Sequence, residues 1–301
     1  MSRIQRIKDE INDLFKNPLD DNNIFYELDN DNINILKVMM IGTKDTPYEN
    51  GFFFFTVRYP ENYPNSPPKV WYYTTHHRMR FNPNLYNNGK ICLSIINTWG
   101  NQDNWTSVMN TRSVLLSIQS MVLNEEPLKN EPGIKITEKH INDYNNVLYY
   151  CVFNIAILEN LIITREHFLE NNSKTQTISF ECFKDKINEY FINNIDWYIN
   201  KCKFLHSKFN TSNVFFTWPY DKVSYSCNYL HVLQKLAEVY EKISKNKLND
   251  IFIDLDMINL NKLTIPKLKI LCKKNNIKKY SGKTKKQIIE LILTKNEKII
   301  I

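Results

Sequence analysis

One cysteine stands out because a polar, asparagine-rich loop leads directly to it. The segment FNPNLYNNGKICLSI covers residues 81–95, and within it Asn84 lies eight residues before Cys92, next to the turn-forming Pro83. A thiol that exchanges acyl groups needs access to solvent and a hydrogen-bond donor for the oxyanion of the tetrahedral intermediate. The side-chain amide of Asn84 is suited to that role, so this spacing favours acyl transfer through Cys92.

Two simpler interpretations stay open from these residues alone. A cysteine followed by apolar residues is often a small core residue, and an asparagine next to a proline often hydrogen-bonds its own loop as an Asx turn. If Cys92 is a nucleophile, we expect its sulfur at the exterior of the protein with the Asn84 amide beside it. A sulfur sealed within apolar packing and remote from that amide would contradict the assignment.

Two cysteine–histidine pairs raise the question of a zinc site. Cys202 with His206, and Cys227 with His231, repeat at i, i+4, a spacing that places both side chains on one face of a helix. Two such pairs could supply four tetrahedral zinc ligands. Because neither half contains a CxxC pair, we prefer buried cysteines and incidental histidines.

A cysteine hydrolase is a rival use of Cys92. It would require an imidazole beside the thiol, and no sequence pattern places His140 or His167 there. His76 and His77 are nearest in sequence, where we interpret them as surface loop residues.

The composition predicts a folded protein without a membrane span. Of the 301 residues, 43% are hydrophobic and 13% aromatic, enough apolar surface to build a core. No apolar run approaches the roughly 18 residues that a bilayer span requires, and the charged amino terminus is unlike a secretory signal. The six cysteines form no CxxC pair and are expected as reduced thiols. We therefore expect an intracellular protein, cytoplasmic or nuclear, or a viral protein within a host cell.

Hydrophobic periodicity predicts one helix, then strands, then further helices. An amphipathic helix opens the chain behind Ser2, and four strand-like runs with short connections imply an antiparallel meander. Residues 76–110 lose regular period, as functional loops do. The predicted strands begin at Ile24, Ile33, Phe52 and Val70, and later helices cover residues 114–122 behind Asn110 as N-cap, 138–170, 180–206 and 228–245.

Three motifs resemble those of ubiquitin-conjugating enzymes and follow in the family's order. Pro83, Asn84 and Cys92 match the His-Pro-Asn motif and the thioester cysteine eight residues after its asparagine. Residues 63–70 are similar to Tyr-Pro-x-x-Pro-Pro-x-Val, and residues 42–51 to the hairpin Gly-x-x-x-Thr-Pro-Tyr-Glu-x-Gly. The resemblance is strong to residue 133 and looser from there to about Cys202.

Two departures from the family pattern are present near the cysteine. Asn82 stands where most members have the histidine that braces the loop, and asparagine can make comparable local hydrogen bonds. The segment after Cys92 is longer than usual and contains Asn97-Thr98-Trp99 before Trp105, which is placed like the family's tryptophan. Both features resemble the conjugating domain of BRUCE-type hybrid conjugating-enzyme/ligases.

The resemblance implies an acyl relay that uses no metal and no cofactor of its own. Ubiquitin would arrive as a thioester of the activating enzyme, which consumes ATP, pass to Cys92, and then be attacked by a substrate lysine. Family members place an acidic residue near the cysteine, and alignment suggests Glu131 for that place. Glu125 and Glu126 are competitors, and all three also fit surface charges at helix ends.

The implied partners are ubiquitin, its activating enzyme, substrate proteins and a possible ubiquitin ligase, with no membrane. In the family the first helix supplies basic residues to the activating enzyme, a role that Arg3, Arg6 and Lys8 would share. An ordinary amphipathic helix with a solvated basic face is the alternative. A rival function is a catalytically silent scaffold on the same fold that binds ubiquitin or DNA.

The carboxyl-terminal end is strongly basic and resembles a SAP module, a two-helix motif that binds A+T-rich DNA. From Asp256 onward there are 12 lysines against three acidic residues. Leu263, Leu268 and Leu271 would form its small core, and Thr284 with Gln287 a capping box. Clustered lysines can neutralise phosphates, but they are also often simply solvated or dock acidic proteins.

These observations together predict an α/β protein, of the α+β kind. We expect a ubiquitin-conjugating domain over residues 1–165, with an N-terminal helix, a four-stranded antiparallel meander and C-terminal helices. A helical extension follows over residues 166–255, and the basic SAP-like module covers residues 256–301.

Overall fold

The computed structural model consists of two compact units, Met1–Leu233 and Gln234–Ile301. It describes residues 2–75, 79–100, 103–133, 135–162, 166–171, 174–209, 213–217, 222–244, 260, 263–274, 277–278 and 280–293. The helix α7 (Tyr229–Ser244) contains the boundary between the units. The predicted boundaries at residues 165 and 255 stay predictions.

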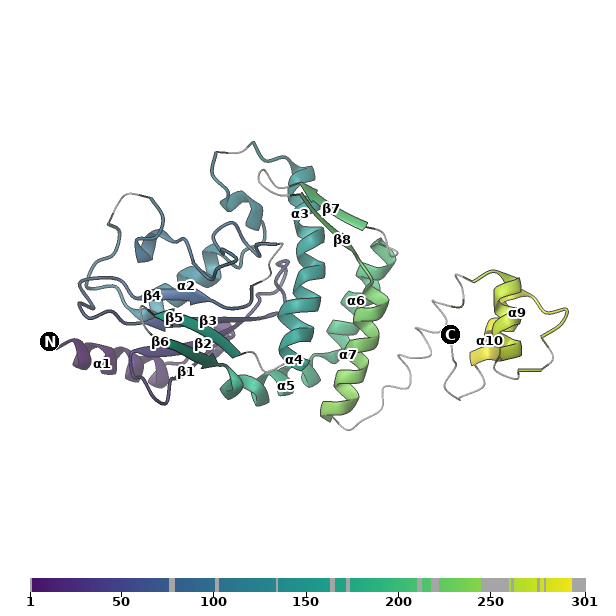
Figure 1. Ribbon diagram of the computed structural model, residues 1–301, viewed down its shortest axis with the longest axis horizontal. Coiled ribbons are helices and arrows are strands. Elements are labelled where there is room, and N and C mark those ends of the chain that lie inside the picture. Colours follow the sequence, from purple (N-terminus) through teal and green to yellow (C-terminus); the bar gives the residue numbers. More distant parts are fainter. Residues whose placement is uncertain are drawn as a thin grey trace. The chain divides into compact units, whose positions relative to one another are not determined.

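The amino-terminal unit opens as its periodicity predicts (Figure 1). Helix α1 (Arg3–Lys16) begins at Ser2, whose hydroxyl accepts a hydrogen bond from the Gln5 N–H. Its apolar face buries Ile7, Ile11 and Leu14. Burying such a stripe, rather than intrinsic propensity, supplies most of the stability of a helix this short.

The central sheet is the predicted four-stranded antiparallel meander, in the order β1-β2-β3-β4. Short polar connections and β-branched or aromatic residues produce this topology. Side chains of β2 and β3 are buried on both faces, and Phe53 and Phe55 are fully enclosed. The strands are β1 (Ile24–Leu28), β2 (Ile35–Ile41), β3 (Phe52–Arg58) and β4 (Lys69–Tyr72).

Several helices follow the sheet in this unit. Helix α2 (Thr111–Met121) begins at the predicted N-cap, since Asn110 and Ser113 form a capping box. Helix α3 (Glu138–Cys151) continues through a π-helical segment (Val152–Glu159) into α4 (Asn160–Ile162) as one long helical element (Figure 1). Helices α5 (Lys184–Asn193) and α6 (Ile195–Phe209) follow.

Two β-hairpins lie within residues 166–255, the region predicted as a helical extension. The helix expected over 138–170 ends at Ile162, and β5 (Glu166–Asn171) pairs with β6 (Lys174–Ser179). The second hairpin pairs β7 (Asn213–Thr217) with β8 (Lys222–Ser226), and β7 packs against α3. Their short runs carry too little alternation to separate strand from helix, so tertiary packing decides their conformation.

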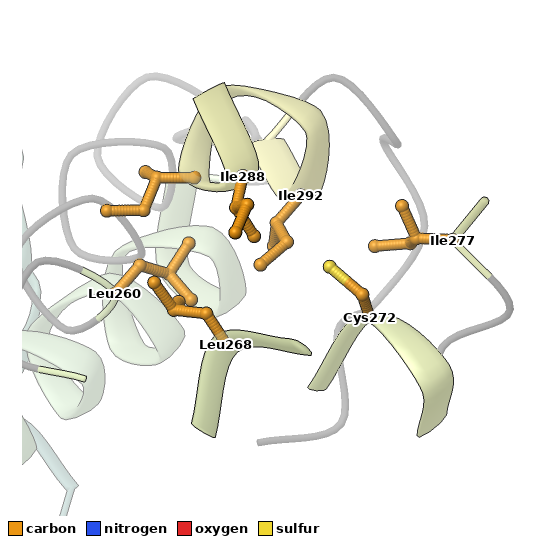
Figure 2. Close-up of a cluster of buried hydrophobic side chains, with 7 residues drawn as sticks. Leu260, Leu268, Cys272, Ile277, Ile288 and Ile292 are labelled. Atoms are coloured by element: carbon orange, nitrogen blue, oxygen red, sulfur yellow. The ribbon is translucent and has the colours of Figure 1, made fainter. Parts of the chain in front are cut away.

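The carboxyl-terminal unit contains two short helices around a small core, as the leucine and isoleucine spacing predicts. Side chains from α9 (Ile265–Lys274) and α10 (Lys285–Leu293) point toward one another in Figure 2. Thr284 and Gln287 form the predicted capping box. The buried cluster comprises Leu260, Leu268, Cys272, Ile277, Ile288, Ile289 and Ile292, with Leu263 packed against it. The side chain of Leu271 lies outside the described residues.

Among the described residues, no helix has the length and apolar character needed to cross a bilayer.

A buried carboxylate joins α1 to the start of α2. Glu10 is 9% exposed, and its two oxygens accept hydrogen bonds from the Tyr63 hydroxyl at 2.6 Å and from both the backbone N–H and the hydroxyl of Thr111 at 2.8 Å. Arg6 pairs with the same carboxylate at 2.5 Å. Since the Thr111 N–H begins a helix, the carboxylate also interacts favourably with the helix dipole.

Replacing Glu10 by alanine leaves these donors buried without an acceptor. We expect Glu10→Ala to lower the free energy of unfolding by about 3 kcal/mol. Urea denaturation followed by tryptophan fluorescence measures this. The neighbouring exposed Asp9 is the control, because its backbone is in the same helix and Asp9→Ala removes no buried acceptor. Equal stability of the two variants would contradict this role for Glu10.

Candidate active site

Residues 84–92 form a narrow hairpin, called here the cysteine loop, whose two ends are joined by hydrogen bonds between Asn84 and Cys92. The Cys92 N–H donates to the Asn84 carbonyl at 2.9 Å, and the Asn84 side-chain amide donates to the Cys92 carbonyl at 2.6 Å. At the tip the Tyr86 N–H donates to the Lys90 carbonyl, and Gly89 adopts a φ of 87°, a conformation that favours glycine. The eight-residue spacing therefore sets the register in which the asparagine lies opposite the cysteine.

Asn82 links this hairpin to the end of α2 through its side chain. Its side chain is fully buried, with the amide donating to the Val122 carbonyl after α2 at 2.8 Å. Its side-chain oxygen accepts from the Asn84 N–H at 2.8 Å and from the Asn130 side chain at 3.2 Å. Asparagine thus makes the local hydrogen bonds expected of it where most of the family has histidine.

The hairpin at residues 42–51 supports the same loop from the sheet side. A Cβ on Gly42 would lie 1.8 Å from the Tyr48 carbonyl oxygen, so the two strands can approach only with glycine there. Tyr48 is fully buried, and its hydroxyl donates to the Phe81 carbonyl at 2.5 Å. Burial raises the pKa of Tyr48 well above its ordinary value, which keeps the phenol a donor.

Cys92 itself is buried, which corrects the expectation that its sulfur lies at the exterior. The residue is 4% exposed. The Asn84 side chain is adjacent as expected, but it is bonded to the Cys92 carbonyl. One of its two amide hydrogens makes this bond, and within the described residues the Asn84 oxygen has no hydrogen-bond partner.

Tyr86 and Arg80 belong to the site, although sequence reasoning did not select them. Burial raises the pKa of Tyr86, and a hydrogen bond and a charge interaction with the Cys92 side chain raise it further. The Arg80 guanidinium lies 4.1 Å from the centre of the Tyr86 ring. Arg80 precedes and Tyr86 follows the Asn-Pro-Asn segment, and this closeness in sequence was the signal that could have identified them. Their contacts with each other arise only when the hairpin folds.

Glu131 lies close enough to interact with this group. Burial raises the pKa of its carboxyl, and the charge of Arg80 opposes that rise. The same carboxyl raises the pKa of Tyr86. By contrast, Glu125 and Glu126 are exposed, and Glu126 pairs with Lys129 at 2.6 Å. Glu131 is therefore the acidic residue of the three that is linked to the group around Cys92.

The lengthened segment after Cys92 packs against the motif at residues 63–70. The Asn97 side-chain oxygen accepts from the backbone N–H groups of Asn104 and Trp105 at 2.9 and 3.0 Å. The Trp105 indole is buried and donates to the Pro64 carbonyl at 2.7 Å. These contacts fix both ends of the segment beside the cysteine loop.

Basic residues of α1 are largely engaged within the unit. Arg3 donates to the carbonyls of Pro60 and Tyr59 at 2.7 and 2.9 Å, and Arg6 donates to the Met109 carbonyl at 2.8 Å. Lys8 is exposed. Arg3 and Arg6 therefore anchor the helix to the unit, and Lys8 is the residue of these three that is presented to solvent.

The cysteine–histidine pairs do not converge on a metal site. Cys202 donates its thiol to the Tyr229 carbonyl at 3.3 Å, and His231 is exposed while Cys227 is fully buried. In the part of the chain that the structure describes, no group of three or more histidine, cysteine or acidic residues is arranged to hold a metal.

Histidines do not supply a partner for Cys92 within the described side chains. His140 is exposed and forms a capping box with Thr137 at the start of α3. His206 is buried in α6. His76 and His77, and the side chain of His167, lie outside the described residues.

Comparison with known proteins identifies the family. A family model described as ubiquitin-conjugating enzyme matches residues 6–150. The ubiquitin-conjugating enzyme E2 Z of Xenopus tropicalis is 31% identical over 244 residues, which are 80% of this chain and 72% of that protein. The chain belongs to the ubiquitin-conjugating enzyme family, as its three motifs indicated.

Two other relatives match over shorter stretches. The probable ubiquitin-conjugating enzyme protein 17 of Caenorhabditis elegans is 40% identical over 158 residues, 50% of this chain and 22% of that protein. The human dual E2 ubiquitin-conjugating enzyme/E3 ubiquitin-protein ligase BIRC6 is 48% identical over 114 residues, 36% of this chain and 2% of that protein. The second match is to a hybrid conjugating enzyme and ligase, the type that the cysteine loop resembles. This chain therefore spans a small part of either protein.

Proposed function

We propose that this protein accepts ubiquitin as a thioester on Cys92 and transfers it to substrate lysines. The observation that carries the proposal is the hairpin in which Asn84 is held directly opposite Cys92 by two hydrogen bonds. The family membership supports the choice of ubiquitin, its activating enzyme and a ligase as partners.

Loading of Cys92 is a thiol exchange. The Cys92 thiolate attacks the carbonyl carbon of the ubiquitin thioester, a new C–S bond forms, and the activating enzyme's sulfur leaves as a thiolate. The oxyanion of the intermediate needs a donor, and the second amide hydrogen of Asn84 is a candidate. Its first amide hydrogen holds the Cys92 carbonyl in place.

Transfer to a substrate requires loss of a proton from the attacking amine. As the amine nitrogen bonds to the carbonyl carbon, the C–S bond breaks and Cys92 leaves as a thiolate. The Glu131 carboxylate is the proposed acceptor of the amine proton. Its raised pKa, which follows from burial, makes it a stronger base than an exposed carboxylate.

Incubation with activating enzyme, ATP and ubiquitin tests the first step. We expect an adduct on non-reducing gels that thiol reductant removes, because the bond is a thioester. Cys92→Ala abolishes the adduct, and Cys92→Ser yields an ester that resists reductant. Cys182→Ala is the matched control, since Cys182 is an exposed thiol of the same unit. The absence of any adduct would favour a catalytically silent scaffold, and a reducible adduct that survives in Cys92→Ala would assign loading to another cysteine.

Discharge of the preformed thioester to free lysine tests Glu131. We expect Glu131→Gln to slow discharge roughly 100-fold while loading is unchanged, because the amide cannot take up the proton. A base must be deprotonated to act, and the pKa of Glu131 is raised. The wild-type rate should therefore fall with decreasing pH at values above the ordinary carboxyl range.

Glu125→Gln is the control for this experiment, because Glu125 is exposed and belongs to the same segment. A discharge rate that drops equally in both variants would assign the effect to general surface charge.

A second partner is proposed for the carboxyl-terminal unit, namely duplex DNA. From Leu263 onward its described side chains include the lysines 267, 269, 273, 278, 283, 285 and 286 and one acidic residue, Glu290. Lys267, Lys273, Lys278 and Lys286 are exposed. Such a surface can displace counterions from a phosphate backbone, which favours a polyanion over a neutral partner.

Fluorescence anisotropy of an A+T-rich duplex with the full-length protein tests this proposal. We expect the logarithm of the binding constant to fall linearly with the logarithm of the salt concentration. Changing Lys267, Lys273 and Lys286 together to glutamine should reduce that slope by about 2 to 3. The matched control changes Lys8, Lys16 and Lys44, exposed lysines of the first unit. An equal reduction of the slope in both triple variants, or binding that does not depend on salt, would contradict DNA as the partner and favour an acidic protein.

A further inference from the structure

Cys92 is buried, yet the ubiquitin thioester that its sulfur is proposed to attack belongs to a macromolecule. A residue that is 4% exposed cannot present its sulfur to a macromolecular thioester without some local movement. The group that moves must lie against the sulfur and must be able to leave without breaking the loop. Tyr86 is the residue of the described site that meets both conditions.

The backbone around the thiol is fixed. Asn84 and Cys92 are joined by two hydrogen bonds, and the turn is closed by the Tyr86 N–H to the Lys90 carbonyl and the Gly89 N–H to the Tyr86 carbonyl, both at 2.9 Å. Opening the loop would break several of these bonds at once. A side-chain rotation breaks none of them and takes place in nanoseconds or less for partly exposed residues.

The Tyr86 side chain lies on the same face of the hairpin as Cys92 and is held there weakly. Asn84 pairs with Cys92 and Leu85 with Ile91, so Tyr86 and Cys92 are diagonal neighbours across the two strands, a spacing that an aromatic side chain can reach. Tyr86 is half-buried. The Arg80 guanidinium lies 4.1 Å and the Lys90 ammonium 5.8 Å from the ring centre. Cation–π contacts of this kind are worth little enough at a partly exposed site to be broken readily.

We propose that the Tyr86 side chain is a movable cover of the Cys92 thiol, that Arg80 positions it, and that it turns away before the sulfur accepts an acyl group. Tyr86 is thus a positioning residue for the thiol. The proposal deepens the proposed function because it concerns the same sulfur. Its test uses no ubiquitin, so a failure of ubiquitin loading and a failure of the cover give different results.

Alkylation of the folded, full-length protein by iodoacetamide measures access to the thiol. Mass spectrometry of the peptides that contain Cys92 and Cys182 gives the ratio of their rates, and the exposed Cys182 serves as an internal reference. We expect Tyr86→Ala to raise this ratio roughly ten-fold, because the cover is removed. Tyr86→Phe should restore the wild-type ratio within about two-fold, since the ring remains.

Tyr149→Ala is the matched control, because Tyr149 is also partly buried and has a cation, Lys201, 5.2 Å from its ring centre. Its loss should leave the ratio unchanged. Arg80→Gln keeps the ring and the surrounding apolar packing, and should raise the ratio about three-fold by releasing the ring. Circular dichroism of each variant establishes that it is folded.

An unchanged ratio in Tyr86→Ala, or an equal rise in Tyr149→Ala, would overturn the proposal. If Tyr86→Ala does not fold, Arg80→Gln decides the question, and an unchanged ratio in that variant would overturn it.

Discussion

The pair of hydrogen bonds between Asn84 and Cys92 is the constraint on which the site depends. Cys92 uses its main chain in both of them, while Asn84 uses its main-chain carbonyl in one and its side-chain amide in the other. The loop cannot shift by a residue without losing both bonds, because they require this register. Cys92 is therefore held directly opposite Asn84.

The supports of that loop come from distant parts of the chain. Asn82 joins it to the end of α2, and Tyr48 joins it to the hairpin at residues 42–51. At the other end of α2, the buried Glu10 carboxylate ties the first turn to α1. The helix is thus held at both ends, and Asn82 and Tyr48 position the residues near Cys92 through hydrogen bonds inside the protein. Breaking these bonds would leave buried polar groups without partners, which is costly, so they favour one arrangement of the loop.

The two compact units carry different physical characters. The first has a large aromatic core and a polar network around one thiol. The second has a small core of leucine, isoleucine and cysteine (Figure 2). Its exterior is rich in lysine. With so few apolar side chains, the second unit can bury little surface, and its repelling lysines oppose compaction. An anionic partner would relieve that repulsion, which is the physical basis for proposing one.

The sequence by itself determined the features that depend on local spacing. The N-caps at Ser2, Asn110 and Thr284 and the meander of β1 to β4 follow from patterns a few residues long. The alignment of Asn84 with Cys92 also follows, because an eight-residue hairpin fixes which residues face each other.

Tertiary structure decided what depends on contacts between distant segments. Cys92 is enclosed instead of exposed, Arg3 is bonded to the chain near Pro60, and Tyr86, Arg80 and Glu131 come together only when residue 131 folds back beside the loop. The two hairpins after α4 also depend on tertiary structure, because short runs of mixed polarity adopt the conformation that their neighbours allow. Burial and charge pairing are properties of the packed chain, and no local pattern specifies them.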